Sequence, residues 1–197
     1  MNKNTKAFVE YVKQQCKENG VICDLRDTSH VIVAKGIKVS GYFDDSVPTL
    51  VCSMKRKDSY EILAHEFAHF TQWMDQCYEW ASLGDSVSKV DDWLQGKKVK
   101  NIKRCLAKVR DLELDNEKRT VKLIKKFNLP VDIQKYKKKA NAYVMFYNHL
   151  YRTRRWCKPG NSPYSNRRVM EVMPYKFNMN YSKIPKKLEK IFIEEGI

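Results

Sequence analysis

The stretch EILAHEFAHFTQW, residues 61–73, contains two histidines four residues apart, and a glutamate directly follows the first. Most of its other residues are apolar, and they fall on nearly every side of a helical turn. A helix that is apolar all round is typical of the centre of a domain. The pattern therefore predicts a buried helix over residues 60–75, with Asp58 and Glu61 forming a capping box at its start.

The spacing of His65, Glu66 and His69 indicates a metal site. Residues four apart lie above one another on an α-helix, so the two imidazoles can bind one ion, and zinc is the expected metal. Glu66 is rotated by about 100° from His65, which places it toward the water on the metal rather than the metal. The motif thus combines two ligands with a general base. In the alternative interpretation these are core residues, and burying two imidazoles and a carboxylate is costly unless they are paired or metallated.

Following a small predicted sheet, His65, Glu66 and His69 resemble the motif of the zincin metallopeptidases. The resemblance implies an α+β fold with a small, mostly antiparallel sheet packed on a buried active-site helix, followed by further helices. It also implies a zinc-dependent peptidase in which Glu66 is the general base and the substrate is a protein or peptide. The chain further resembles small phage-encoded proteins that carry this motif.

A catalytic zinc usually takes three protein ligands. The best source of the third is the predicted helix VRDLELDNEKRTVKLI, residues 109–124, where Glu113 and Glu117 share one face with aliphatic residues. This pair is similar to the second helix of the gluzincins, a branch of the zincins. The similarity implies that Glu113 binds zinc and that Glu117 orients one of the two histidines, although the gluzincins often have aspartate in the second place. Glu117 and Asp115 stay open as alternative ligands.

Other candidates for the third ligand are weaker. The only other histidines are His30 and His149. A metzincin pattern would need glycine at position 72 and histidine or aspartate at position 75. Asp75 fits the second requirement, but Gln72 stands where a glycine is needed for a sharp turn.

A late helix with the sequence NAYVMFYNHLYRTRR, residues 141–155, offers donors for a developing oxyanion. His149 and Tyr147 are the residues we select for this role, because the oxyanion needs a donor besides the metal. Tyrosines at helical spacing are also an ordinary core pattern, and this alternative stays open.

The remaining elements follow from hydrophobic periodicity and from turn signals. We expect one domain, 1–197, divided into an N-terminal helix and sheet (1–58) and a helical part that carries the site (59–197). Lys35 and Gly36 are expected to form a tight turn, and the strand at 49–54 is expected to be an edge that pairs with an extended peptide. Helices are expected at 5–18, 101–127, 132–156 and 185–195, strands at 21–25, 30–34, 37–43 and 49–54, and a loop at 158–168.

The chain is strongly basic, with 38 Lys and Arg against 23 Asp and Glu, a net charge of +15 concentrated after residue 96. Such a surface attracts polyanions, so non-specific nucleic-acid binding is an alternative to a merely solubilising surface. A DNA-associated protease that clears protein crosslinks would need a third histidine soon after the motif, and none occurs between 69 and 149. A non-catalytic phage effector that uses a zincin fold as a binding module would not need Glu66.

Composition and compartment are less specific. Hydrophobic residues make up 43% of the 197 residues, which is enough for an ordinary core and argues against disorder. The six cysteines show no C-x-x-C spacing and are expected to be reduced. The N-terminal residues lack the apolar core of a signal peptide, so we expect a soluble cytoplasmic protein with no membrane association, located in the host cytoplasm if the protein is phage-encoded.

Overall fold

The computed structural model describes residues 2–33, 36–158 and 160–197. It contains two compact units, and each is built from two separate segments of the chain. Unit 1 comprises Met1–Cys77 and Asn116–Val131, and unit 2 comprises Tyr78–Asp115 and Asp132–Ile197. Lys35, which was expected in a tight turn, lies outside the described residues.

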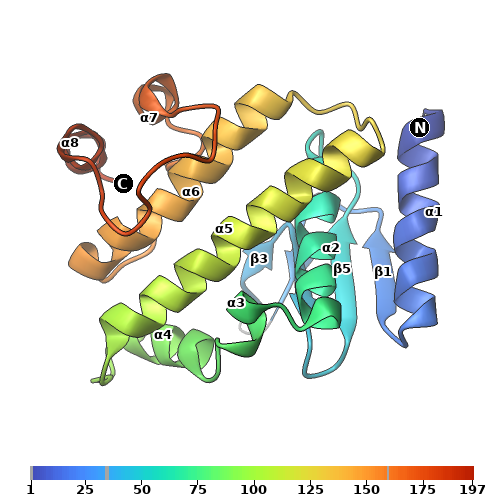
Figure 1. Cartoon of the computed structure of the whole chain (residues 1–197), viewed down its shortest axis with the longest axis horizontal. Coiled ribbons are helices and arrows are strands. Elements are labelled where there is room, and N and C mark those ends of the chain that lie inside the picture. Colours follow the sequence, from blue (N-terminus) through green and yellow to red (C-terminus); the bar gives the residue numbers. More distant parts are fainter. Residues whose placement is uncertain (1, 34–35, 159) are drawn as a thin grey trace. The chain divides into compact units, whose positions relative to one another are not determined.

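Unit 1 combines a small sheet with helices, which confirms the predicted α+β class (Figure 1). The three-stranded sheet has the order β1-β5-β4 and is mixed, since β1 is parallel to β5 and β4 is antiparallel to it. Strands β2 and β3 form a separate antiparallel hairpin. The elements are α1 (Lys3–Glu18), β1 (Ile22–Arg26), β2 (Val31–Ile32), β3 (Lys38–Val39), β4 (Gly41–Asp44), β5 (Thr49–Ser53), α2 (Ser59–Asp75) and the last turns of α5 (Ile102–Lys126).

The expectation that strand 49–54 is a sheet edge is wrong. Strand β5 lies between β1 and β4 and is the central strand. Its residues Leu50, Val51 and Cys52 point alternately to both faces, and each is at most 1% exposed. A continuous apolar run of this kind is typical of a strand that is covered on both faces. Strand β4, not β5, is an outer strand of the sheet.

The motif helix α2 packs on the face of the sheet to which Gly41 and Phe43 belong. In the register, Gly41 is opposite Cys52 and Phe43 is opposite Leu50. The Phe43 ring contacts that of Trp73 at a centroid distance of 5.7 Å. A Cβ atom on Gly41 would lie only 3.0 Å from Cγ of Glu66 and 3.1 Å from Cγ2 of Ile62, both on α2, so glycine permits the close approach of α2. Figure 1 shows α2 in front of β5.

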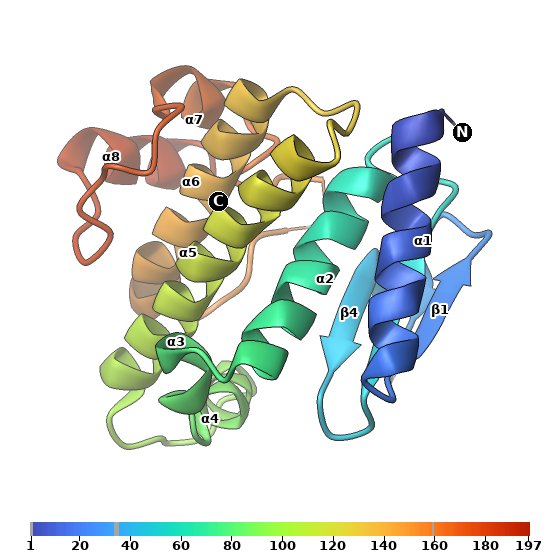
Figure 2. The ribbon, with the colours of Figure 1, turned by 45° about the vertical axis from the view of Figure 1, so that its right-hand side comes forward.

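Helix α1 packs on the same side of the sheet, beside α2 (Figure 2). Phe8 and Tyr11 of α1 both contact the Phe67 ring of α2, at 6.4 and 5.7 Å between centroids. The end of α5 closes this core, because Lys126 lies over the Tyr11 ring at 4.3 Å and Phe127 contacts Phe8 at 5.1 Å. These aromatic contacts hold α1, α2 and the end of α5 together in unit 1.

The predicted capping box at the start of α2 is wrong at Asp58. Asp58 occupies the N-cap position, but its side chain makes no cap hydrogen bond. Its carboxylate instead accepts two hydrogen bonds from the guanidinium of Arg56, at 2.8 and 2.9 Å. A charge-assisted, two-pronged pair is stronger than a single bond to a main-chain amide, so the local ion pair prevails.

Unit 2 is helical, and its core is formed by the part of α5 before Asn116 together with α4, α6, α7 and α8. Phe146, Leu150 and Phe192 are at most 1% exposed in this core. The short helices α3, α4 and α7 were not predicted, because their apolar positions are too few to show a period. The elements are α3 (Tyr78–Ala81), α4 (Ser86–Leu94), the first turns of α5, α6 (Ile133–Thr153), α7 (Arg167–Val172) and α8 (Lys186–Glu194).

In the part of the chain that the structure describes, no helix combines the length and the apolar character needed to cross a bilayer.

Candidate metal centre

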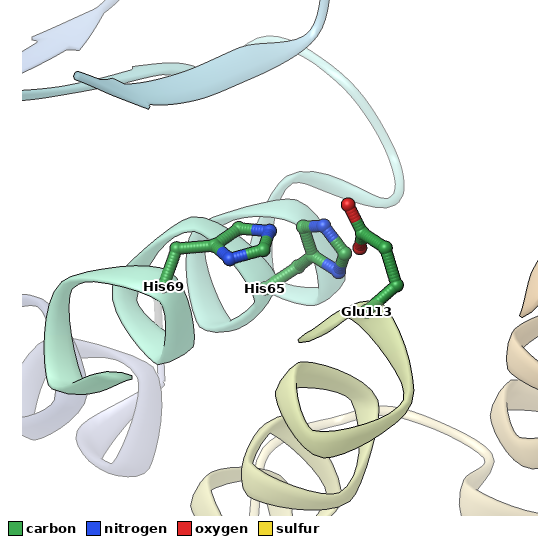
Figure 3. Close-up of side chains that lie close together, drawn as sticks. All are labelled: His65, His69 and Glu113. Atoms are coloured by element: carbon green, nitrogen blue, oxygen red, sulfur yellow. The ribbon is translucent and has the colours of Figure 1, made fainter. Parts of the chain in front are cut away.

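The histidines of the motif lie on one face of α2, as the spacing predicts. The rings of His65 and His69 are 4.9 Å apart between centroids and nearly perpendicular, at 87°. Both side chains are half-buried, whereas Glu113 of α5 is buried. One ligand atom from each of the three residues lies within 4.8 Å of the others (Figure 3). This group could hold a metal ion.

Helix α5 is held to the motif helix by its own side chains within unit 1. Arg119 donates to the Thr71 hydroxyl at 3.3 Å and pairs with the Asp75 carboxylate at 2.5 Å. One turn earlier, Asn116 and Glu117 both approach His65. Because α5 is continuous from Ile102 to Lys126, the same helix sets the position of Glu113, one turn before Glu117.

The Nδ1 atom of His65 faces acceptors and donors on α5. It lies 3.3 Å from Oε1 of Glu117 and 2.9 Å from the amide nitrogen of Asn116. The Asn116 side chain is fully buried, and its Oδ1 has no hydrogen-bond partner among the described residues. A half-turn of that amide would exchange its two atoms and let Oδ1 accept the Nδ1 proton. Glu117 already offers an acceptor there, so a proton on Nδ1 leaves the lone pair of Nε2 for a metal.

His69 is oriented by a different residue. Its Nδ1 lies 2.9 Å from Oε1 of Gln72, and Gln72 is fully buried. With the Nδ1 proton donated to this oxygen, Nε2 keeps the lone pair that binds a metal. Gln72 and Asn116 were not selected from the sequence. The sequence signal that could have identified them is an amide side chain on a helix face that is otherwise apolar. Burying such an amide without a hydrogen-bond partner would be costly.

The metzincin alternative does not fit the structure. Helix α2 continues through Gln72 and ends at Asp75, and the left-handed residue that ends it is Gln76. Asp75 pairs with Arg119 and is not part of the metal-binding group. Asp115 is half-buried and also lies outside that group.

Glu66, the predicted general base, faces the sheet. Its Cγ would lie 3.0 Å from a Cβ atom on Gly41, so the side chain runs alongside β4. Burial raises the pKa of Cys52 to about 12, and the Glu66 carboxylate contributes to this rise. Glu66 therefore lies near the outer strand β4, on the helical turn that connects the two histidines.

His149 and Tyr147 lie in the core of unit 2. Nε2 of His149 is 3.0 Å from the main-chain oxygen of Ile197, and the ring contacts Phe192 at 5.3 Å. The hydroxyl of Tyr147 is 3.1 Å from that of Tyr143. These are ordinary core environments, and the oxyanion role of both residues stays a prediction. His30 hydrogen-bonds to Ser29 at 3.1 Å and is not part of the metal-binding group.

Comparison with known proteins found no match to this chain among protein-family models, curated proteins or solved structures. Any inference about function therefore rests on the geometry of the site. Two imidazole nitrogens and one carboxylate oxygen are a donor set that suits zinc with a position left for water. His65, His69 and Glu113 thus form a group that could hold a metal ion.

Proposed function

We propose that this chain is a zinc-dependent hydrolase of peptide bonds, built on a zincin-like arrangement of sheet and motif helix. The observation that carries the proposal is the convergence of His65, His69 and Glu113, with one ligand atom from each within 4.8 Å of the others. Glu66 lies on the same helix, between the two histidines, where a general base is required.

The orienting residues support this assignment. Gln72 and Glu117 each face the Nδ1 atom of one motif histidine. Such partners fix the tautomer in which Nε2 is the ligand, and they raise its basicity. Two core histidines that served only packing would not need acceptors of this kind at the same ring position.

A bound zinc would supply Lewis acidity and would lower the pKa of a coordinated water toward neutrality. The protein's own contribution to the chemistry is Glu66, which accepts a proton from the attacking water and delivers it to the leaving amine. His65, His69 and Glu113 would hold the ion, and Glu113 would reduce its net charge.

An extended peptide is the substrate that the surroundings of Glu66 suit best. Strand β4 is an outer strand of the sheet, and Gly41 in it lies against Glu66. A peptide added to this edge by main-chain hydrogen bonds would run past the general base. We therefore propose residues 41–44, rather than residues 49–54, as the edge that binds an extended substrate.

The test is an unbiased peptide-library cleavage assay with the zinc-loaded protein and the Glu66→Gln variant. Because the amide keeps the shape of the side chain but accepts no proton, turnover should fall by about 10²–10⁴-fold while zinc content stays the same. The Glu10→Gln variant is the matched control, since it makes the same substitution at an exposed carboxylate of α1 outside the group and should cleave as the unmodified protein does. No cleavage by the zinc-loaded protein, or loss of zinc in Glu66→Gln, would overturn the proposal.

A further inference from the structure

One segment of unit 2 is strongly basic. Residues 132–197 contain 15 Lys and Arg and five Asp and Glu, a net charge of +10. All five acids of the segment are used within the unit. Asp132 caps α6, and the four glutamates are paired as Glu171 with Arg167, Glu189 with Arg152, and Glu194 and Glu195 with Arg168.

These pairs leave other cations of the segment without a carboxylate. Within the described residues, neither Arg155 nor Lys158 forms an ion pair, and both are exposed. They flank Trp156 in the sequence, directly after α6 ends at Thr153. Their charges are therefore available to an anion from outside the molecule.

Aromatic rings are exposed at the same place. Trp156 is 44% exposed and Tyr164 is 42% exposed. Both contact the Tyr143 ring, at 6.4 and 6.1 Å between centroids. Trp156 also packs edge-on against the buried ring of Phe146 at 5.3 Å. Each ring thus packs against side chains of α6, while part of the ring stays exposed to solvent.

We propose that Arg155, Trp156, Lys158 and Tyr164, here called the Trp156 patch, bind single-stranded nucleic acid. Unpaired bases would stack on the two rings, and the phosphates would contact Arg155 and Lys158. The bases of a duplex are already stacked and cannot occupy these rings without unpairing. This inference does not depend on the proposed hydrolase function, since it uses no residue of the metal-binding group.

The first test separates stacking from charge. Binding of an oligothymidylate is compared with binding of an abasic oligonucleotide of the same length, which keeps the phosphates and lacks the bases. The oligothymidylate should bind more tightly, and Trp156→Ala should weaken it by at least about fivefold while leaving the abasic affinity unchanged. Tyr164→Leu is the second variant and should also weaken oligothymidylate binding without changing the abasic affinity. Circular dichroism is used to check that each variant is folded.

The second test measures the phosphate contacts. The double variant Arg155→Gln/Lys158→Gln should reduce the slope of log affinity against log salt by about 1.4, since each phosphate contact on a single strand contributes about 0.7. Lys135→Gln/Lys137→Gln is the matched control, because it removes the same charge near the start of α6, about 30 Å away along the helix. Its slope should stay the same.

Three outcomes would overturn the proposal. Equal affinity for the oligothymidylate and the abasic strand would show that the rings do not bind bases. Equal loss of slope in the control variant would show diffuse attraction by the whole basic surface. Binding to phosphatidylserine vesicles without binding to either oligonucleotide would make the Trp156 patch a membrane contact.

Discussion

His149 of unit 2 and the pair His65 and His69 of unit 1 are all histidines on long helices, but their surroundings differ. His149 is 3% exposed, and its Nε2 faces a main-chain oxygen at 3.0 Å. His65 and His69 are half-buried, and their Nδ1 atoms face side-chain oxygens of Glu117 and Gln72. The first arrangement gives a core imidazole one main-chain partner and leaves its Nδ1 without a hydrogen bond among the described residues, whereas the second orients two imidazoles toward a common point.

The comparison shows that the partner of a histidine is more informative than its helical position. In the core, one ring nitrogen of a histidine can donate a hydrogen bond to a main-chain carbonyl. The other ring nitrogen then faces apolar neighbours and has no metal or polar group to bind. A side-chain acceptor at Nδ1 fixes the tautomer that exposes a lone pair at Nε2. The predictions below test whether this difference in partners corresponds to a difference in role.

The largest effect is expected from the motif histidines. The double variant His65→Ala/His69→Ala should lose essentially all of the roughly one zinc per chain that we expect in the unmodified protein, because two of three ligands are removed. Elemental analysis by mass spectrometry measures the zinc content. His149→Gln is the control variant and should retain zinc in full. If the double variant also retained its zinc, the assignment of the metal site to His65 and His69 would be wrong.

The next effect concerns the choice of ligand on α5. Glu113→Ala should weaken zinc binding by more than about 100-fold, beyond what loss of an orienting residue produces. Asp115→Ala should leave it nearly unchanged, since Asp115 is turned by about 200° from Glu113 on the helix. A competition titration with a chromogenic chelator gives both affinities. If Asp115→Ala lowers the zinc affinity more than Glu113→Ala does, the face of α5 that contacts His65 and His69 is not the one that contains Glu113.

A smaller effect is expected from the orienting residues. Gln72→Ala and Glu117→Ala should each reduce zinc affinity by about 10–100-fold, because the imidazoles lose the acceptors that fix their tautomers. Gln72→Glu keeps an acceptor oxygen and should recover most of the loss. A purely structural role for Gln72 would instead lower the unfolding temperature of Gln72→Ala without changing its zinc affinity.

The smallest effect is the contribution of His149 to the pH dependence of stability. Burial lowers the pKa of His149 below its usual value, and the nearby Arg152 and Arg155 also favour the neutral ring. The unfolded chain therefore binds more protons at this residue than the folded chain. The resulting destabilisation is absent above the ordinary histidine pKa of about 6.5 and grows as the pH falls below it.

Urea unfolding between pH 5 and pH 8 measures this contribution. The loss of stability of the unmodified protein on acidification should be smaller in His149→Gln, which can still donate a hydrogen bond to the Ile197 oxygen. Identical pH dependence in the two proteins would contradict the assignment of His149 as a neutral core histidine.

Much of the local structure could be predicted because it depends on residues that are close in the sequence. Helical periodicity located α1, α2, α5, α6 and α8 to within a few residues, and the four-residue spacing alone placed His65 and His69 on one face. The face of α5 that contains Glu113 and Glu117 was also recognised, because acids among aliphatic residues need a partner. These features follow from the geometry of a single helix.

The tertiary structure alone decided which elements meet. The parallel pairing of β1 with β5 makes residues 49–53 a central strand, and no local pattern distinguishes this strand from a buried edge. The same holds for the side chains of α5 that approach His65. Asn116 became recognisable only when the packing of α5 against α2 placed its amide beside the imidazole, whereas Gln72 lies three residues after His69 on the same helix. The physical reason is that hydrophobic periodicity reports which face of an element is buried, whereas the identity of the neighbour depends on how distant segments pack.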